Sequence, residues 1–471
     1  MILDSLPSTR HIHLIGICGT AMASLAGMLQ KKGFQITGSD QNVYPPMSTF
    51  LQDLGISVFQ GFSESHLEPR PDLVVIGNVV SRGNPEAEST LNEKIPYTSL
   101  AEIVKKVFIQ GKTSVVVTGT HGKTTTTALL AWLLESAGHR PSFLLGGIAQ
   151  NFGSSFQITD GKHFIIEGDE YDTAFFDKSP KFLHYLPELV IFNNCEYDHA
   201  DIYPNFDSVQ QSFQRLLNII PSRGVLIAGW DDPVVRQLSG GSLAPVVSFG
   251  IGQEAQWTAQ SIQYLEQSTC FQVFKLGKLW GRFEIPLVGS FNVRNALAAL
   301  ICANCLGLSK ESIAQGLLNF KSVKRRLEFR GESRGIMIFD DFAHHPTAIS
   351  ATLTALKTCF PRNRLWAIFE PRSATARRKV FQSEFSRCFA NADHVVLSSI
   401  FAPEKLAPHL RLNLDLLVED LGRQGLQATC LPSASEIIKY VAPRLQPGDK
   451  VVIMSNGHFD DIHNKLLDAI C

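Results

Sequence analysis

The chain has 471 residues, 44% of them hydrophobic and 18% charged, which is typical of a globular protein with several domains of about 100–200 residues each. Its 43 Lys and Arg residues almost equal its 44 Asp and Glu residues, and no long run of one charge occurs, which argues against nucleic acid as a partner. Residues 1–16 lack the pattern of a signal peptide and no apolar stretch of about 18 residues occurs, so we expect a cytoplasmic protein without a membrane partner.

Residues 1–107 begin with a strand pattern, HIHLIG, followed by a small-residue turn and by a helical pattern, AMASLAGMLQKKG, that ends at Gly33. Two further apolar strand patterns, FQITGSD and DLVVIGN, complete a βαβ layout. This order of elements predicts an N-terminal Rossmann-like domain with a parallel sheet.

Residues 108–323 open with the strand pattern TSVVVTGT and a helix, and then alternate apolar strands such as ELVIFNN with helical patterns such as FDSVQQSFQRLLNII. They predict a central α/β domain of the P-loop ATPase type. Residues 324–471 again alternate strands, such as RLWAIFE, with helices, and predict a Rossmann-like C-terminal domain. The expected fold class is therefore α/β with three domains.

The nine cysteines are odd in number and scattered through the chain, which favours reduced thiols over a disulfide framework. Cys302 and Cys305 have CxxC spacing, but their segment has helical apolar spacing, and no second Cys/His pair lies near them in the sequence. We expect two helix thiols in the core there, in preference to a metal or redox site.

The stretch VVVTGTHGKTTTT joins a buried strand to a helix through a loop that suits a phosphate. A helix N-terminus offers unpaired N–H groups and partial positive charge, and Gly119 and Gly122 allow the backbone to close around an anion. Lys123 supplies a charge for the terminal phosphates and Thr124 a hydroxyl for Mg²⁺. Of the three threonines that follow, Thr125 is the one that we expect to reach a phosphate. Two residues separate the first glycine from Gly-Lys, where the common P-loop has four, and the alternative is a Gly turn capped by threonine.

Acidic and imidazole side chains follow two other predicted strands of the central domain. Glu167 comes directly after KHFII, and His199, flanked by Asp198 and Asp201, follows ELVIFNN. Ligands of an open parallel sheet bind at the carboxyl ends of its strands, so these groups suit Mg²⁺ ions that bridge phosphate oxygens. The alternatives are an exposed strand-end carboxylate and an ordinary turn histidine.

The first domain has a loop of its own, GICGTAM, between a strand and a helix. It resembles the dinucleotide fingerprint, but Cys18 stands where the second glycine belongs, and Asp40 is the acidic candidate about 20 residues further on. We favour a diphosphate site for another nucleotide over a redox Rossmann site.

With TGTHGKTTT, EGDEYD, YDHADIY, GSFNVRNALAA, VKRRLEFRG and DDFAHHPTAI in this order, the chain resembles the Mur ligase family along nearly its whole length. The resemblance implies an N-terminal domain for a UDP sugar, a central ATPase domain and a C-terminal domain for an amino substrate. It also implies ATP and Mg²⁺ as cofactors, and amide-bond formation through an acyl phosphate.

The family's functional residues carry over to the positions that match its motifs. Those implied to contact ATP are Gly119, Thr120, His121, Gly122, Lys123, Thr124, Thr125, Asn292, Asn295, Arg326 and Asp341. Those implied to hold the UDP sugar are Gly16, Cys18, Gly19, Thr20, Asp40, Asn78 and Ser81. The implied metal ligands are Thr124, Glu167 and His199, and the implied catalytic groups are Lys123, Glu167, His199 and His344.

The strings YPPMST, EYDTAFFDK, FEPRS and MSNG resemble the murein-recycling branch of the family. That resemblance implies two substrates, UDP-N-acetylmuramate and the murein tripeptide L-Ala-γ-D-Glu-meso-diaminopimelate. Two departures stand out. The chain has no lysine between Lys181 and Lys275 that could be carbamylated to hold a second metal, as in several branches, and Phe291 stands where the adenosine motif often has histidine.

Three other functions remain open at this point. A ligase that adds L-alanine to the same UDP sugar would need a pocket for one small amino acid, which MSNGHFDDIHNK does not resemble. A regulator that binds UDP-muramyl compounds without joining them would not need Glu167 paired with His199, nor Arg326 with Asp341. An NAD-type dehydrogenase is disfavoured by the imperfect GICG loop and by the additional GTHGKT loop.

Overall fold

The computed structural model describes residues 10–44, 47–252 and 254–471, so Pro45 and Pro46 of YPPMST lie outside the described residues. The chain divides into two compact units. The first contains the described residues up to Cys195 with those of Asp207–Gln256 and Ala298–Gly316, and the second contains Glu196–Phe206, Trp257–Leu297 and Leu317–Cys471. The domain boundaries predicted after residues 107 and 323 stay predictions.

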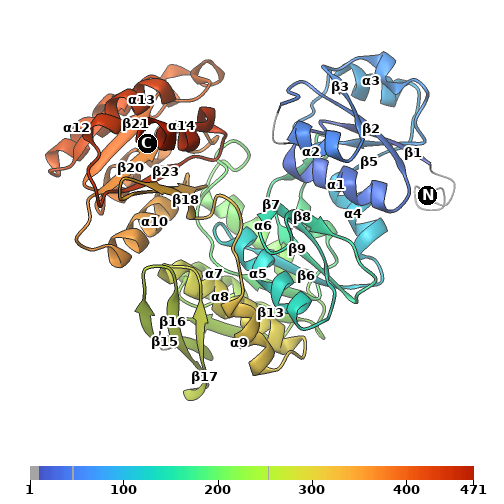
Figure 1. Ribbon diagram of the computed structural model, residues 1–471. Helices are drawn as coiled ribbons and strands as arrows, with labels where there is room; N and C mark the ends of the chain where they lie inside the picture. Colours follow the sequence, from blue (N-terminus) through green and yellow to red (C-terminus); the bar gives the residue numbers. More distant parts are fainter. Residues whose placement is uncertain (1–9, 45–46, 253) are drawn as a thin grey trace. The chain divides into compact units, whose positions relative to one another are not determined.

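The first unit begins with a parallel sheet in the strand order β3-β2-β1-β4-β5 (Figure 1). Its elements are β1 (His11–Ile15), α1 (Thr20–Lys31), β2 (Gln35–Asp40), α2 (Met47–Asp53), β3 (Ser57–Gln60), β4 (Leu73–Ile76), α3 (Pro85–Asn92), β5 (Tyr97–Ser99) and α4 (Leu100–Val104). The inner strand β4 is buried along its whole length, which explains its unbroken apolar run LVVI. The predicted Rossmann-like fold is confirmed here.

The same unit contains a run of strands in the order β14-β13-β12-β6-β9-β7-β8, parallel except for β8. Its elements are β6 (Thr113–Thr118), α5 (Lys123–Ser136), β7 (Ser142–Ala149), β8 (Ser154–Gln157), β9 (His163–Gly168), β10 (Asp172–Ala174), β11 (Asp177–Pro180), β12 (Leu189–Phe192), α6 (Phe206–Asn218), β13 (Val225–Gly229), α7 (Pro233–Ser239) and β14 (Val246–Gly250). Because β12, β6 and β9 are parallel neighbours, the loops that follow them lie at one edge of the sheet.

The second unit contains an antiparallel set, β15 to β17, and a sheet in the order β18-β19-β23-β20-β21-β22 that is parallel except for β18. Two helices, α8 (Ser290–Cys305) and α9 (Lys310–Leu318), contribute residues to both units. The other elements are β15 (Trp257–Tyr264), β16 (Thr269–Lys275), β17 (Lys278–Ile285), β18 (Glu328–Ser333), β19 (Ile336–Asp341), α10 (Pro346–Cys359), β20 (Leu365–Phe369), α11 (Gln382–Cys388), β21 (His394–Ser398), α12 (Leu414–Arg423), β22 (Gln427–Leu431), α13 (Ala434–Val441), β23 (Lys450–Met454) and α14 (Ile462–Ala469).

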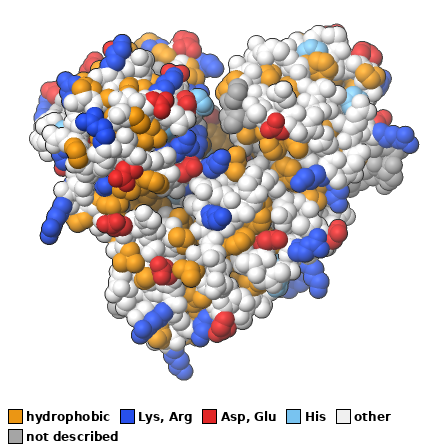
Figure 2. Space-filling view, viewed as in Figure 1, with side chains coloured by type: hydrophobic (Ala, Val, Ile, Leu, Met, Phe, Trp, Pro, Cys, Tyr) orange, Lys and Arg blue, Asp and Glu red, His pale blue; other side chains and the backbone are white. Residues whose placement is uncertain are grey.

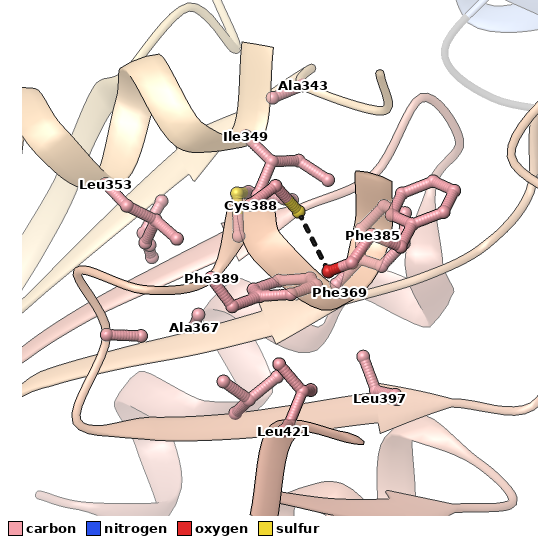
Figure 3. Close-up of a cluster of buried hydrophobic side chains, with 14 of the residues drawn as sticks. Ala343, Ile349, Leu353, Ala367, Phe369, Phe385, Cys388, Phe389, Leu397 and Leu421 are labelled. Atoms are coloured by element: carbon pink, nitrogen blue, oxygen red, sulfur yellow. Dashed lines mark hydrogen bonds between the residues drawn. The ribbon is translucent and has the colours of Figure 1, made fainter. Parts of the chain in front are cut away.

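Hydrophobic clusters cover both faces of this sheet. Along β20, Ala367 and Phe369 belong to one cluster, whereas Trp366 and Ile368 belong to the other, as the alternation of side chains along a strand requires. Figure 3 shows the first cluster, in which the ring centroids of Phe369 and Phe385 lie 5.5 Å apart. Burial on both faces explains the continuous apolar run of β20, and the polar residues of FEPRS begin where that run ends.

None of the nine cysteines, all of which lie in the described part of the chain, forms a disulfide, as predicted. Cys302 is buried, but Cys305 is exposed at the last position of α8, so the prediction of two core thiols is wrong for Cys305. Among the helices of the described residues, none is long and apolar enough to cross a bilayer. On the face shown in Figure 2, acidic and basic side chains are interspersed.

Candidate nucleotide and substrate sites

The loop between β6 and α5 has a backbone that only glycine adopts without strain. Gly119 has a φ of +128°, and Gly122, which precedes the first residue of α5, has a φ of +82°. A Cβ on Gly119 would lie 2.8 Å from the carbonyl oxygen of Asn194, so this loop also packs tightly against the loop after β12. Within the described residues no side chain caps the N-terminus of α5, and a helix end of this kind binds anions.

Lys123 is paired with a buried carboxylate at this loop. Its Nζ donates to the carbonyl oxygen of Gly119 at 2.6 Å and lies 3.1 and 3.0 Å from Oε1 and Oε2 of Glu170, whose side chain is 2% exposed. Burial lowers the pKa of Lys123, but the charges of Glu170 and Asp169 outweigh it and raise the pKa. Lys123 is therefore an ammonium ion whose carboxylate partner a phosphate oxygen can replace.

Thr124 and Glu167, both predicted as metal ligands, meet at the N-terminus of α5. The hydroxyl of Thr124 donates to Oε2 of Glu167 at 3.0 Å, and the amide N–H of Gly146 donates to Oε1 at 2.6 Å. A hydroxyl and a carboxylate are the hard oxygen donors that Mg²⁺ prefers. The two residues therefore fit a magnesium ion beside the phosphate loop. Thr125, the next residue of α5, is buried with a 6% exposed fraction.

Asn194, in the loop after β12, fixes the backbone of the phosphate loop. Its Oδ1 accepts from the amide N–H of His121 at 2.7 Å, its Nδ2 donates to the carbonyl oxygen of His121 at 3.2 Å, and its own carbonyl oxygen accepts from Thr120 N–H at 3.1 Å. Thr120 and His121, both predicted to contact ATP, are thus held in place by their backbone groups.

The loop of the five-stranded sheet that follows β1 is closed by backbone hydrogen bonds. The amide N–H of Gly16, whose φ is +81°, donates to Ser39 O at 2.8 Å, and that of Cys18 donates to Oδ2 of Asp40 at 2.9 Å. Burial, and then the charge of Asp40, raises the pKa of Cys18 to about 11, so its thiol adds no charge to the loop. Asp40 therefore supports the loop directly.

The other residues predicted at the UDP sugar lie beside this loop. Gly19 and Thr20 begin α1, whereas Asn78 and Ser81 are exposed in the segment after β4. A Cβ on Gly16 would lie 3.4 Å from Val79, so the two loops are in contact. Within the first unit, the structure thus brings all the predicted UDP-sugar residues to one edge of the sheet, since β2, β1 and β4 are parallel neighbours.

In the second unit, Asp198 brings two predicted histidines together. Nδ1 of His199 lies 4.0 Å from its Oδ1, and Nε2 of His344 lies 3.9 Å from its Oδ2. Burial raises the pKa of Asp198, but the neighbouring His199, His344 and His345 hold it well below the ordinary range of an aspartate. Because Nδ1 of His344 lies 3.0 Å from Phe342 O and a carbonyl only accepts, the proton of His344 is on Nδ1.

Asp341 supports the segments on either side of it. Its carboxylate accepts from the amide N–H groups of Leu327 at 2.6 Å and of Ala343 at 2.7 Å. Burial raises its pKa to about 6, against the opposing effects of Arg326 and these hydrogen bonds. The guanidinium of Arg326 lies 4.8 Å from the ring centroid of Phe342. Contact of Asp341 and Arg326 with the nucleotide stays a prediction.

Asn292 and Asn295, predicted to contact adenosine, are buried on α8 at 5% and 6% exposure. Nδ2 of Asn295 donates to Oδ1 of Asn292 at 3.4 Å, and Nδ2 of Asn292 donates to Val288 O at 2.9 Å. The two amides therefore bond to one another and to the chain, and their contact with adenosine remains a prediction.

The strings FEPRS and MSNG meet at the carboxyl ends of β20 and β23, which are parallel neighbours. Nη2 of Arg325 donates to the carbonyl oxygens of Ser455 at 2.5 Å and Gly457 at 2.6 Å, and Nε of Arg325 lies 3.5 Å from the buried Asp340. The hydroxyl of Ser455 donates to Oε2 of Glu370 at 2.5 Å. Arg325 and Glu370 therefore fix the loop that the sequence suggested for the amino substrate.

Glu170, Arg325 and Asn194 are among the residues at these sites that had no predicted role. Glu170 is one of four acids in EGDEYD, and only its position in the fold shows which of them faces Lys123. Arg325 adjoins the predicted Arg326 but contacts a loop about 130 residues away in sequence, and no local pattern reveals such a contact. Asn194 is the last residue of the predicted strand pattern ELVIFNN and follows β12 in the structure, and its position at a strand end was the signal that the sequence offered.

Known proteins are similar to the chain along nearly its whole length. Three family models match in chain order: Mur ligase family, catalytic domain, at residues 11–110; Mur ligase middle domain at 117–303; and Mur ligase, glutamate ligase domain, at 325–457. The chain is 38% identical over 463 residues to the UDP-N-acetylmuramate–L-alanyl-gamma-D-glutamyl-meso-2,6-diaminoheptandioate ligase of Haemophilus influenzae, covering 98% of this chain and 99% of that protein.

A second relative, the UDP-N-acetylmuramate–L-alanine ligase of Alkaliphilus metalliredigens, is 33% identical over 95% of both chains. Among solved structures, the murein peptide ligase of Psychrobacter arcticus has a TM-score of 0.75 and 35% identity, and 98% of each chain is covered. The matches run from the first sheet to the last, in the same order as the motifs. The chain belongs to the Mur ligase family.

Proposed function

We propose that the chain joins the lactyl carboxylate of UDP-N-acetylmuramate to the α-amine of L-Ala-γ-D-Glu-meso-diaminopimelate, with ATP converted to ADP and phosphate, as a cytoplasmic step of peptidoglycan recycling. The observation that carries the proposal is the likeness, over nearly the full length of both chains, to the Haemophilus influenzae ligase named for these two substrates. The nine cysteines without a disulfide suit a reducing compartment.

A free carboxylate is a poor acyl donor because its oxygen is a poor leaving group. Attack of the lactyl carboxylate on the γ-phosphate gives an acyl phosphate and ADP, and the amine then displaces phosphate. In this proposal the γ-phosphate takes the place of Glu170 at Lys123, which lies at the N-terminus of α5. The ammonium and the helix end would then stabilise the negative charge that develops on the phosphate.

Thr124 and Glu167 are the residues that would hold Mg²⁺ beside the phosphates, and His199 is a further proposed ligand. When bound, Mg²⁺ neutralises charge on the phosphate oxygens and orients them. The hydroxyl–carboxylate pair of Thr124 and Glu167 supports this assignment, since both side chains offer hard oxygen donors. The chain has no lysine between Lys181 and Lys275 that could be carbamylated to hold a second metal. Carboxylate and imidazole groups would therefore have to hold the metal without it.

For the second step, the attacking amine has to lose a proton. We propose that Nε2 of His344 accepts this proton. Nδ1 of His344 already carries a proton, which it donates in a hydrogen bond to Phe342 O. The ionised Asp198 would stabilise the resulting imidazolium. We further propose that the UDP diphosphate binds the loop of Gly16 and Cys18 in residues 1–107, that ATP binds in residues 108–323 and that the peptide binds in residues 324–471.

Transfer of labelled oxygen tests the acyl-phosphate step. UDP-N-acetylmuramate carrying ¹⁸O in its lactyl carboxylate is incubated with ATP, Mg²⁺ and the tripeptide, and the released phosphate is weighed by mass spectrometry. One ¹⁸O atom per phosphate is expected, because the carboxylate oxygen leaves with the phosphoryl group. Phosphate without the label would contradict the acyl phosphate, and no phosphate at all would favour a regulator that binds these compounds without joining them.

A further inference from the structure

We propose that Glu86 is a positioning residue for the UDP sugar, because its buried carboxylate fixes the two loops, after β1 and after β4, at which this substrate is expected to bind. The inference rests on the proposed function. Glu86 is the second residue of α3, and its side chain is 0% exposed. It therefore acts on the substrate only through the residues that it holds.

The carboxylate of Glu86 joins three other segments of the first sheet. Its Oε2 accepts from the hydroxyl of Ser39 on β2 and lies 3.3 Å from Nε2 of His13 on β1. Its Oε1 accepts from the amide N–H of Ser63 at 3.1 Å and lies 2.7 Å from Nδ1 of His66. Because a carboxylate only accepts, both histidine nitrogens carry protons. All of these partners are donors, which matches an ionised glutamate.

The second ring nitrogen of His13 is also paired, so this network is complete on the side of β1. Nδ1 of His13 lies 2.9 Å from Oγ1 of Thr37, and Nε2 of His11 lies 2.8 Å from the same oxygen. With its proton on Nε2, His13 accepts from the hydroxyl of Thr37, which in turn accepts from His11. Burial raises the pKa of Glu86, but the hydrogen bonds from its side-chain donors outweigh this effect and lower the pKa. Glu86 is therefore ionised at neutral pH.

Ser39 connects Glu86 to the loop after β1. Its hydroxyl donates to Glu86, whereas its carbonyl oxygen accepts from the amide N–H groups of Gly16 at 2.8 Å and Ile17 at 3.1 Å. The next residue, Asp40, holds the same loop through the amide N–H of Cys18. Glu86 thus holds the end of β2, whose residues close the loop that is proposed for the diphosphate.

The start of α3 connects Glu86 to the segment after β4. Oδ1 of Asn84 accepts from the amide N–H groups of Glu86 at 3.0 Å and Ala87 at 3.1 Å, which caps the helix. Asn84 ends the segment that contains Asn78 and Ser81, both expected at the UDP sugar. Because the carboxylate ties α3 to β1 and β2, it fixes this segment relative to the diphosphate loop.

The sign of the effect separates positioning from simple electrostatics. The diphosphate and Glu86 are both anions, so repulsion alone predicts that removing the carboxylate charge strengthens binding of the UDP sugar. Positioning predicts the opposite. Glu86→Gln keeps the shape of the side chain but replaces one acceptor oxygen by an NH₂ group. The N–H of Ser63 cannot accept, so this NH₂ group should face Ser39 and His13 and break the bond that holds Ser39.

The test measures binding directly. The Kd values of UDP-N-acetylmuramate and of UDP are determined by calorimetry at neutral pH, and the KM values of all three substrates by steady-state kinetics. Glu86→Gln, Ser39→Ala and the double variant are compared with wild type. Thr90→Val is the control, because Thr90 is also buried on α3 and donates to the main-chain oxygen of Glu86 at 2.7 Å. Its loss weakens the helix without changing the carboxylate.

Glu86→Gln should raise the Kd of both UDP compounds, and the KM of UDP-N-acetylmuramate, by about tenfold or more, because hydrogen bonds to a charged group are lost. The KM values of ATP and the tripeptide should stay within about twofold of wild type. Ser39→Ala should raise the same Kd values by about three- to tenfold, and the double variant should bind no more weakly than Glu86→Gln, because both residues act through one hydrogen bond. Thr90→Val should lower the Tm but leave both Kd values within about twofold of wild type.

An unchanged or lower Kd in Glu86→Gln, an equal rise in Thr90→Val, or additive losses in the double variant would overturn the assignment. If Glu86→Gln does not fold, the comparison of Ser39→Ala with Thr90→Val decides in its place. Turnover of the tripeptide by wild type tests the proposed function separately. If wild type binds UDP-N-acetylmuramate without turnover, the proposed function fails and the Kd values still decide the role of Glu86, and if wild type does not bind it, both fail.

Discussion

Nζ of Lys123 and Oε2 of Glu170 lie 3.0 Å apart at the start of α5, so the lysine of the phosphate loop has a buried counter-ion. Burial alone would favour a neutral amine, and the surrounding carboxylates reverse that effect. A nucleotide that enters the loop therefore has to replace one anion at Lys123 by another. This exchange can be measured.

Glu170→Gln should destabilise the nucleotide-free protein and increase its response to ATP. Removing one partner of a buried ion pair leaves an uncompensated charge and costs about 3–5 kcal/mol. ATP would restore the missing negative charge, so the rise of Tm on adding ATP should exceed that of wild type in thermal unfolding. Glu88→Gln, which removes the partner of the exposed Arg82, serves as control. An ATP-induced shift no larger than that of wild type would contradict the exchange.

Glu167→Gln should raise the Mg²⁺ concentration needed for half-maximal phosphate release by about tenfold or more, because a neutral amide is a weaker ligand than a carboxylate. The amide oxygen of Gln can still accept from the N–H of Gly146, and the hydroxyl of Thr124 can accept from the new amide NH₂, so the fold around β9 should be kept. Titration of Mg²⁺ at saturating ATP measures the effect, with the exposed Glu93→Gln as control. An unchanged Mg²⁺ dependence would make Glu167 a structural residue only.

Gly119→Ala should abolish most ATP turnover, whereas Gly153→Ala should not. Both glycines have positive φ, +128° and +62°, so both substitutions strain the backbone. Only at Gly119 would the new Cβ also meet a backbone atom, the carbonyl oxygen of Asn194 at 2.8 Å, and the space around Gly153 is open. Initial rates of phosphate release compare the two variants, and equal losses would mean that backbone strain alone explains the effect.

Asp341 should make the second unit more stable at low pH than at neutral pH. Burial raises its folded pKa from 3.8 to about 6, so its contribution is fully present below pH 3.8 and is lost as pH rises through 6. The loss amounts to about 3 kcal/mol at most. Asp341→Asn cannot ionise, so the Tm of wild type minus that of the variant should fall as pH rises from 4.5 to 7.5. A difference that rises with pH would show that Asp341 is stabilised as an anion.

Local patterns sufficed for the parallel strands and for the phosphate loop, but they did not predict the antiparallel strands β8, β15 to β17 and β18. The strand–glycine–lysine–helix order around Gly119 and Lys123 predicts a single turn of chain, and the structure has the turn, the positive φ values and the helix start where the pattern places them. The Rossmann-like order of β1, β2 and β4 follows from the same kind of pattern, since apolar strands alternate with helices.

Contacts between distant segments could not be predicted in this way. Asp198 and His344 are nearly 150 residues apart in sequence, and Arg325 and Ser455 are about 130 residues apart. These contacts depend on which strands become neighbours in the folded sheet. The exposure of Cys305 was missed for a different reason. Helical spacing predicts one apolar face, but it does not show that the last turn of α8 reaches the surface.

The choice between the tripeptide and L-alanine is tested most directly by product mass. The protein is incubated with UDP-N-acetylmuramate, ATP and Mg²⁺, with L-Ala-γ-D-Glu-meso-diaminopimelate in one tube and L-alanine in another, and phosphate and products are measured. We predict UDP-N-acetylmuramoyl-tripeptide and one phosphate per product in the first tube, and no product in the second. Product with L-alanine alone would contradict the account and identify a ligase of wall synthesis, and no product in either tube would identify a protein that binds these compounds without joining them.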